Sequence, residues 1–72
     1  MKSIVKILET DVGFTEIKRL TNRVGNSYGI STNVARIPNE RDQFTLSVEG
    51  KSTSVDSAME DICDLCNGYI IG

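Results

Sequence analysis

Two stretches of this chain space their apolar residues at helical intervals, and each stretch lies between runs that have strand character. The first begins near Thr15 and the second near Ser54, and in both the apolar residues recur every three or four positions. Such residues fall on one face of a helix, and that face is buried against another element. The stripes consist of Phe14, Ile17, Leu20 or Thr21, and Val24 in the first stretch, and of Val55, Ala58, Met59, Ile62 and Cys66 in the second.

Four segments rich in β-branched, aromatic or leucine residues surround these two helices. They are Ser3–Leu8, Tyr28–Ile37, Phe44–Glu49 and Tyr69–Ile71, and the third alternates strictly between apolar and polar residues. A polar turn, Pro38–Gln43, joins the second and third segments. The order strand-helix-strand-strand-helix-strand predicts an α+β fold of the ferredoxin-like type. We expect a single domain, residues 1–72, with a four-stranded antiparallel sheet and two helices on one of its faces.

Residues that favour helix ends set the expected boundaries of both helices. Thr15 is expected to cap the first helix, and Gly25-Asn26-Ser27 is expected to stop it. Ser54 is expected to cap the second helix, and Asn67-Gly68 to end it. These boundaries leave Thr10–Phe14 as a short loop that leads from the first strand into the first helix.

The charge and composition of the chain argue against several classes of function. Lys and Arg number 8 and Asp and Glu number 10, and the resulting net charge of −2 argues against general nucleic-acid binding, which depends on clustered basic residues. No apolar run approaches the roughly 18 residues that a membrane span needs, and no signal peptide is visible, so we predict a cytoplasmic protein without membrane contact. The chain has no His, which excludes His-based catalysis, and no metal or cofactor is expected.

Both cysteines lie in one short motif, Cys63-Asp64-Leu65-Cys66. A Cys-x-x-Cys motif occurs in redox pairs and as half of a zinc site. Here it lies at the end of a predicted helix, where the helix dipole disfavours the thiolate that redox chemistry needs, and no further zinc ligands are evident. We expect Cys66 to be buried in the apolar stripe and Cys63 to lie at its edge.

The loop Thr10–Phe14 has the form of an anion-binding site without the usual charge. A glycine-containing loop that leads into a helix N-terminus offers free N–H groups to an anion. Here Glu9 and Asp11 flank the loop, and it contains no Lys or Arg. The loop is therefore predicted to keep the shape of an anion cradle while lacking its cation.

Val12-Gly13-Phe14, together with the later segment SYGISTNVARIPNERDQFTLSVEG (Ser27–Gly50), resembles the acylphosphatase family. In that family an Arg follows Val-Gly-Phe, and an Asn lies near the end of the second strand, before a hairpin and a strand that ends in Gly. The resemblance extends from Ile4 to about Leu65. It implies an Arg that binds the phosphate of an acyl phosphate and an Asn that positions the attacking water, without a covalent nucleophile.

Both functional positions of that family are altered in this chain. Thr15 stands at the Arg position, and Thr cannot supply a bidentate positive charge. The Asn position is taken by Asn33, counting forward from the loop, or by Arg36, counting back from the hairpin. Because these two residues point to opposite faces of a strand, only one of them can lie beside the loop. The resemblance implies the relic of a phosphate loop, formed by Asp11, Val12, Gly13, Phe14 and Thr15.

Three functions remain open from the sequence. The first is a non-catalytic acylphosphatase-like module, a pseudoenzyme, that binds a protein partner or forms a homodimer through the sheet face or an edge strand. The second is a weak acylphosphatase in which Arg36 or Arg19 replaces the lost Arg and Asn33 places the water. The third is a small-molecule sensor similar to ACT domains, which share this element order and often carry an Asp followed by Gly in the same loop, as Asp11 and Gly13 do here. In the third, the loop N–H groups bind a ligand carboxylate.

Overall fold

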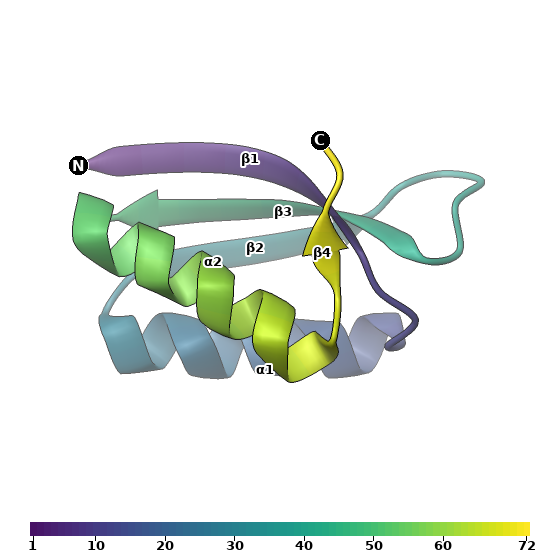
Figure 1. Cartoon of the computed structure of the whole chain (residues 1–72), viewed down its shortest axis with the longest axis horizontal. Coiled ribbons are helices and arrows are strands. Elements are labelled where there is room, and N and C mark those ends of the chain that lie inside the picture. Colours follow the sequence, from purple (N-terminus) through teal and green to yellow (C-terminus); the bar gives the residue numbers. More distant parts are fainter.

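Strands and helices follow one another in the order that the sequence predicts (Figure 1). The computed structural model describes the whole chain, residues 1–72. Along the chain the elements are β1 (Lys2–Glu9), α1 (Phe14–Tyr28), β2 (Ser31–Arg36), β3 (Gln43–Gly50), α2 (Ser52–Cys66) and β4 (Tyr69–Ile70).

The strands form one antiparallel sheet of four strands in the order β2-β3-β1-β4. β1 and β3 occupy the centre and pair along their full length, from Lys2 opposite Gly50 to Glu9 opposite Gln43. β2 pairs with β3 on one side, and the short strand β4 pairs with the end of β1 on the other. This arrangement is compatible with the ferredoxin-like fold that the sequence predicts.

Only one face of the sheet is buried, because both helices pack on that face (Figure 1). On β3, Phe44, Leu46 and Val48 are buried whereas the residues between them are partly exposed, so the strict alternation expected from the sequence is confirmed. Apolar side chains from the helices and the other strands complete the core: Leu8, Ile17, Val24, Val34, Val55, Ala58, Ile62 and Cys66. Neither helix has the length and apolar character that crossing a membrane requires.

α1 continues through Gly25-Asn26-Ser27 and ends at Tyr28, so the predicted stop and the predicted start of the second strand at Tyr28 are wrong. Gly25 is inside the helix because it permits a close approach: a Cβ there would lie 3.0 Å from a side-chain atom of Thr32 and 3.1 Å from the Ile30 carbonyl oxygen. The residue that follows the helix, Gly29, is its C-cap. Its φ of 66° is left-handed, and its N–H donates to the Gly25 carbonyl.

α2 begins at Ser52, so the prediction that Ser54 caps this helix is also wrong. Lys51 is the N-cap, and the Val55 N–H already donates to the Lys51 carbonyl over 2.9 Å. Three successive hydroxyl residues made the start ambiguous in the sequence, and no side chain closes the first turn. The predicted end is confirmed, since Asn67 adopts the left-handed conformation with a φ of 53°.

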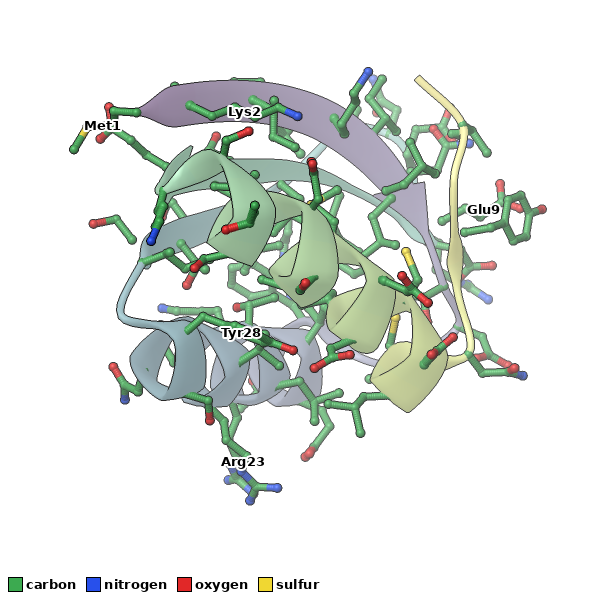
Figure 2. All side chains as sticks on the ribbon, turned by 60° about the vertical axis from the view of Figure 1, so that its left-hand side comes forward. Met1, Lys2, Glu9, Arg23 and Tyr28 are labelled. Atoms are coloured by element: carbon green, nitrogen blue, oxygen red, sulfur yellow. The ribbon has the colours of Figure 1, made fainter.

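One side-chain hydrogen bond joins the two helices. The Tyr28 hydroxyl at the end of α1 donates to the Asp61 carboxylate of α2 over 2.6 Å, and Figure 2 shows Tyr28 between the helices. This hydrogen bond raises the pKa of Tyr28, with smaller contributions from burial and from the negative charges of Asp61 and Glu60. The pKa of Tyr69 is also raised, mainly by a hydrogen bond that its hydroxyl donates to the Glu9 carboxylate.

We expect both tyrosines to ionise above the usual value of about 10. Folding favours their protonated form, so this contribution to stability is fully present below pH ~10 and is lost as the pH rises through the folded-state pKa values. Tyrosinate absorbance measures the ionisation directly, since the chain has two tyrosines and no tryptophan. Tyr28→Phe should leave the titration of Tyr69 alone and reduce the loss of stability at alkaline pH. Ionisation of Tyr28 at its ordinary pKa in the folded protein would contradict the bond to Asp61.

Candidate functional site

The N-terminus of α1 opens onto the larger of the two pockets in the molecule. This pocket has a volume of about 290 Å³ and lies between the loop before α1 and the β2–β3 hairpin. Its lining residues are Asp11, Val12, Gly13 and Phe14 from the loop side, and Arg36, Glu40, Arg41, Asp42 and Phe44 from the hairpin side. The loop that the sequence marks as a candidate anion site therefore forms one wall of a cavity, and the hairpin supplies the other wall.

Thr10 holds this loop in place through three hydrogen bonds. Its N–H donates to the Asp42 carbonyl over 2.8 Å, and its hydroxyl donates to the Cys66 carbonyl over 2.8 Å. The same hydroxyl oxygen accepts a hydrogen bond from the Val12 N–H over 3.2 Å. Thr10 is 4% exposed, so these bonds are shielded from water. The loop is therefore tied to the hairpin and to the end of α2 through one residue.

Phe14 is the first residue of α1, and its ring holds Arg36 beside the pocket. The ring stacks on Phe44 of β3, with 6.0 Å between the centroids and 22° between the planes. The Arg36 guanidinium lies over the same ring, 4.8 Å from its centroid. A cation over an aromatic face is attracted by the ring quadrupole. Arg36 therefore has a defined position although its side chain is exposed to solvent.

Gly13 is the N-cap of α1, but its backbone does not require glycine. Its φ of −65° and ψ of 159° are open to any residue, and a Cβ there would meet no atom within 4 Å. Thr15 is the second residue of α1, so the prediction that it caps this helix is wrong. Since no side chain caps the helix, the N–H groups of Phe14, Thr15 and Glu16 have no partner within it.

Charged side chains of both signs line the pocket without pairing with one another. They are the carboxylates of Asp11, Glu40 and Asp42 and the guanidinium groups of Arg36 and Arg41. The ion pairs of the molecule lie elsewhere, between Lys2 and Asp56 and between Glu16 and Arg19. The positive end of the α1 dipole adds to this mixture. The pocket thus offers uncompensated positive and negative groups within one small volume.

The structure separates the residues proposed for the two functional positions. Arg36 ends β2 on the face that the helices cover, and it lines the pocket. Asn33 lies opposite Ser47 on the uncovered face, so it does not reach the loop. Arg19 forms an ion pair with Glu16 over 3.7 Å and does not line the pocket. Among the basic candidates, Arg36 alone is brought to the loop.

Sequence reasoning missed Thr10 and the charged turn of the hairpin. Glu40, Arg41 and Asp42 were visible as a run of charge, but nothing local indicates that this run lies over the loop before α1. That placement follows from the pairing of β2 with β3, in which Arg36 is opposite Phe44.

The two cysteines are free thiols near the end of α2. Cys66 is buried in the core as expected, and Cys63 is half-buried beside it. Burial, followed by the charges of Cys66 and Asp64, raises the pKa of Cys63, which disfavours the thiolate that an active redox pair needs. No group of three or more His, Cys, Asp and Glu residues is placed to hold a metal ion.

No family model, no curated protein and no solved structure matches this chain. The fold and the site define its class without such a match. It is a small α+β protein with an antiparallel sheet of four strands, two helices on one face, and a pocket of mixed charge at the N-terminus of the first helix. The acylphosphatase and ACT resemblances remain predictions.

Proposed function

We propose that this chain is a non-catalytic regulatory module whose pocket binds a small zwitterion of the free amino acid type. The observation that carries this proposal is the lining of the pocket, where unpaired carboxylates and guanidinium groups surround about 290 Å³ beside an uncapped helix N-terminus. A molecule with one carboxylate and one ammonium group complements both signs of charge. The volume suits a ligand of that size, at the lower end of the usual range for small-molecule pockets.

The ligand carboxylate is expected at the N-terminus of α1, between the helix and Arg36, and the ammonium group beside Asp11. The free N–H groups of Phe14 and Thr15 and the positive end of the helix dipole favour an anion. The Arg36 guanidinium, held over Phe14, can add a charge-assisted hydrogen bond. Asp11 offers a carboxylate to the ammonium group. Because carboxylates outnumber guanidinium groups in the lining, a phosphate dianion is disfavoured at the same place.

Two features of the loop support a binding role over a catalytic one. Thr15 stands where the acylphosphatase resemblance requires an Arg, so the cation needed for that chemistry is absent from its expected position. Asp11 and Gly13 resemble the Asp followed by Gly that ACT domains, a class of small-molecule sensors, often carry in the same loop. Gly13 is not needed for the backbone conformation, and its missing side chain leaves the helix N–H groups accessible to a ligand.

The proposal is tested by thermal denaturation in the presence of each common amino acid, followed by calorimetry on those that raise the Tm. Arg36→Gln and Asp11→Asn should each weaken binding at least about tenfold, because a hydrogen bond to a charged group contributes about 1.5–3 kcal/mol. Arg23→Gln is the matched control, since Arg23 points away from the molecule (Figure 2) and does not line the pocket. Its affinity should equal that of the natural chain.

Two results would overturn the zwitterion proposal. One is the absence of any Tm shift with every amino acid. The other is binding that Arg36→Gln and Asp11→Asn leave unchanged, which would place the ligand elsewhere. If Arg36→Gln weakens binding and Asp11→Asn does not, the ligand carboxylate lies beside Arg36 as proposed, but its ammonium group does not contact Asp11.

A weak acylphosphatase is the second candidate, and the position of Arg36 favours it. This guanidinium lies beside the Val12-Gly13-Phe14 loop, where it can replace the cation that Thr15 does not supply. The test is benzoyl phosphate hydrolysis by the natural chain, Arg36→Gln and Thr15→Arg. Activity above buffer that Arg36→Gln removes would support this function, and rates equal to buffer for the natural chain would exclude it. Hydrolysis by Thr15→Arg alone would mean that the loop can still bind phosphate once its missing cation is restored.

A further inference from the structure

The outer edge of β1 is covered by another strand at one end only. β4 pairs with Leu8 and Glu9, and just beyond it the Ile71 N–H donates to the Ile7 carbonyl over 2.9 Å. The strand predicted over Tyr69–Ile71 is therefore one residue shorter, although its backbone pairing reaches Ile7. From Lys2 to Lys6 no strand lies beyond β1, as Figure 1 shows along the part that begins at the N-terminus.

The backbone groups of Ser3 and Val5 are directed outward along this uncovered stretch. The Ile7 N–H and carbonyl both bond to the β4 side, to Gly72 and Ile71. In an antiparallel strand, alternate residues direct both backbone groups to the same edge. Ser3 and Val5 therefore present their N–H and carbonyl groups to the same side as Ile7, with no strand to receive them. We call this stretch, Lys2–Lys6, the free β1 edge.

Val5 and Lys6 place an exposed apolar side chain on one face of the free β1 edge and an exposed basic side chain on the other. Val5 lies opposite Ser47 on the uncovered face of the sheet and is 63% exposed. Lys6 lies opposite Leu46 on the helix face, is exposed, and takes part in no ion pair. Lys2, on the same face as Lys6, is held by Asp56 at 2.7 Å. An added strand would meet an apolar residue on one face and a free cation on the other.

We propose that the free β1 edge binds an extended segment of another protein that alternates apolar and acidic residues. The backbone of the segment would pair with Ser3 and Val5, which is the mode of recognition by strand addition. One of its apolar side chains would pack beside Val5, and an acidic side chain would lie beside Lys6. This surface lies at the opposite end of β1 from Leu8 and Glu9, so it is independent of the pocket at α1.

A second copy of the chain fits the free β1 edge poorly. Antiparallel pairing of Ser3 with Val5 of a second copy is the register that uses all four outward backbone groups on each chain, and it places Lys2 directly opposite Lys6 of that copy. Like charges in directly opposed positions are destabilising. Lysine on an edge strand also discourages self-pairing in natural proteins. The same Lys6 that opposes a second copy favours an acidic partner.

The test measures the fluorescence anisotropy of two labelled, end-blocked peptides of about eight residues, a common strand length. One peptide alternates valine with glutamate and the other alternates valine with lysine. Val5→Pro removes the outward N–H without affecting the pairing with β3, because the Val5 backbone groups point away from β3. Val5→Thr is its matched control, since threonine keeps the N–H and the strand preference. Lys6→Glu reverses the charge at an exposed position.

The natural chain and Val5→Thr should bind the glutamate peptide, and Val5→Pro should bind it up to about tenfold more weakly, the effect of losing one backbone hydrogen bond. Lys6→Glu should reverse the preference toward the lysine peptide, and this result does not depend on how Val5→Pro folds. Equal binding of the two peptides, no binding of either, or unchanged binding by Val5→Pro would overturn the proposal. So would a dimer in solution that Val5→Pro dissociates, since a second copy would then occupy the edge.

Discussion

Leu46→Ala should lower the free energy of unfolding by about 2–5 kcal/mol, the usual cost of removing a large buried aliphatic side chain and leaving a cavity. Leu46 is 0% exposed and lies on β3, a central strand, on the face of the sheet that the helices cover. A domain of 72 residues has a total stability on the order of 4–11 kcal/mol, so this loss is a large fraction of the whole. Urea unfolding followed by far-ultraviolet circular dichroism measures it.

Val5→Ala is the control for Leu46→Ala, because Val5 lies on the adjacent strand with 63% of its surface exposed. Its effect should stay within about 0.5 kcal/mol, as expected for surface substitutions. Equal losses for the two variants would mean that the uncovered face of the sheet is also packed in solution. That result would point to self-association and would be checked by sedimentation.

Gly68→Ala should destabilise the chain by about 1–3 kcal/mol, the usual cost of forcing an extra carbon into a packed site. A Cβ at this position would lie 2.6 Å from the Glu9 carbonyl oxygen and 3.0 Å from both the Cys66 sulfur and the Thr10 Cβ. The first of these atoms belongs to the backbone of β1, which the sheet holds in place, so the new carbon cannot be accommodated by a side-chain rotation. Thermal and urea unfolding measure the loss.

Gly13→Ala is the matched substitution for Gly68→Ala. Its Cβ would meet no atom within 4 Å and its φ is −65°, so its stability should change by no more than about 0.5 kcal/mol. Gly68→Ala presses on Thr10, which holds the loop beside the pocket, and should weaken ligand binding through the loop. A Gly68→Ala variant as stable as Gly13→Ala would contradict the close packing of Gly68 against β1.

The element types were predictable from the sequence because their signals are local. The alternation from Phe44 to Val48 indicates a strand buried on one face, and the helical spacing from Val55 to Cys66 indicates a helix buried on one side. The end of α1 was not predictable in this way. Glycine commonly ends helices, so Gly25 was read as a stop. Its place inside the helix depends on its close approach to Ile30 and Thr32, which no local sequence pattern indicates.

The candidate site was predictable in its loop and not in its far wall. Glycine followed by a helix start identifies the loop from Val12 to Phe14 directly. The choice between Asn33 and Arg36 required the register of β2, since a shift of one residue exchanges the faces of a strand. The cation over Phe14 requires that register and the stacking of two aromatic rings from distant segments. Such contacts exist only after the sheet has formed.

The central position of β1 has a consequence for how the chain assembles. The β2–β3 hairpin is local and can close early, whereas Lys2 finds its partner only at Gly50, and Leu8 meets β4 only at Ile70. Closing loops of that length costs entropy before any contact compensates for it. During synthesis β1 emerges before β3, so it must wait for β3 before it can pair. β1 is thus made well before the strands that fix it, and its aliphatic residues remain exposed to water and to other chains in the interval.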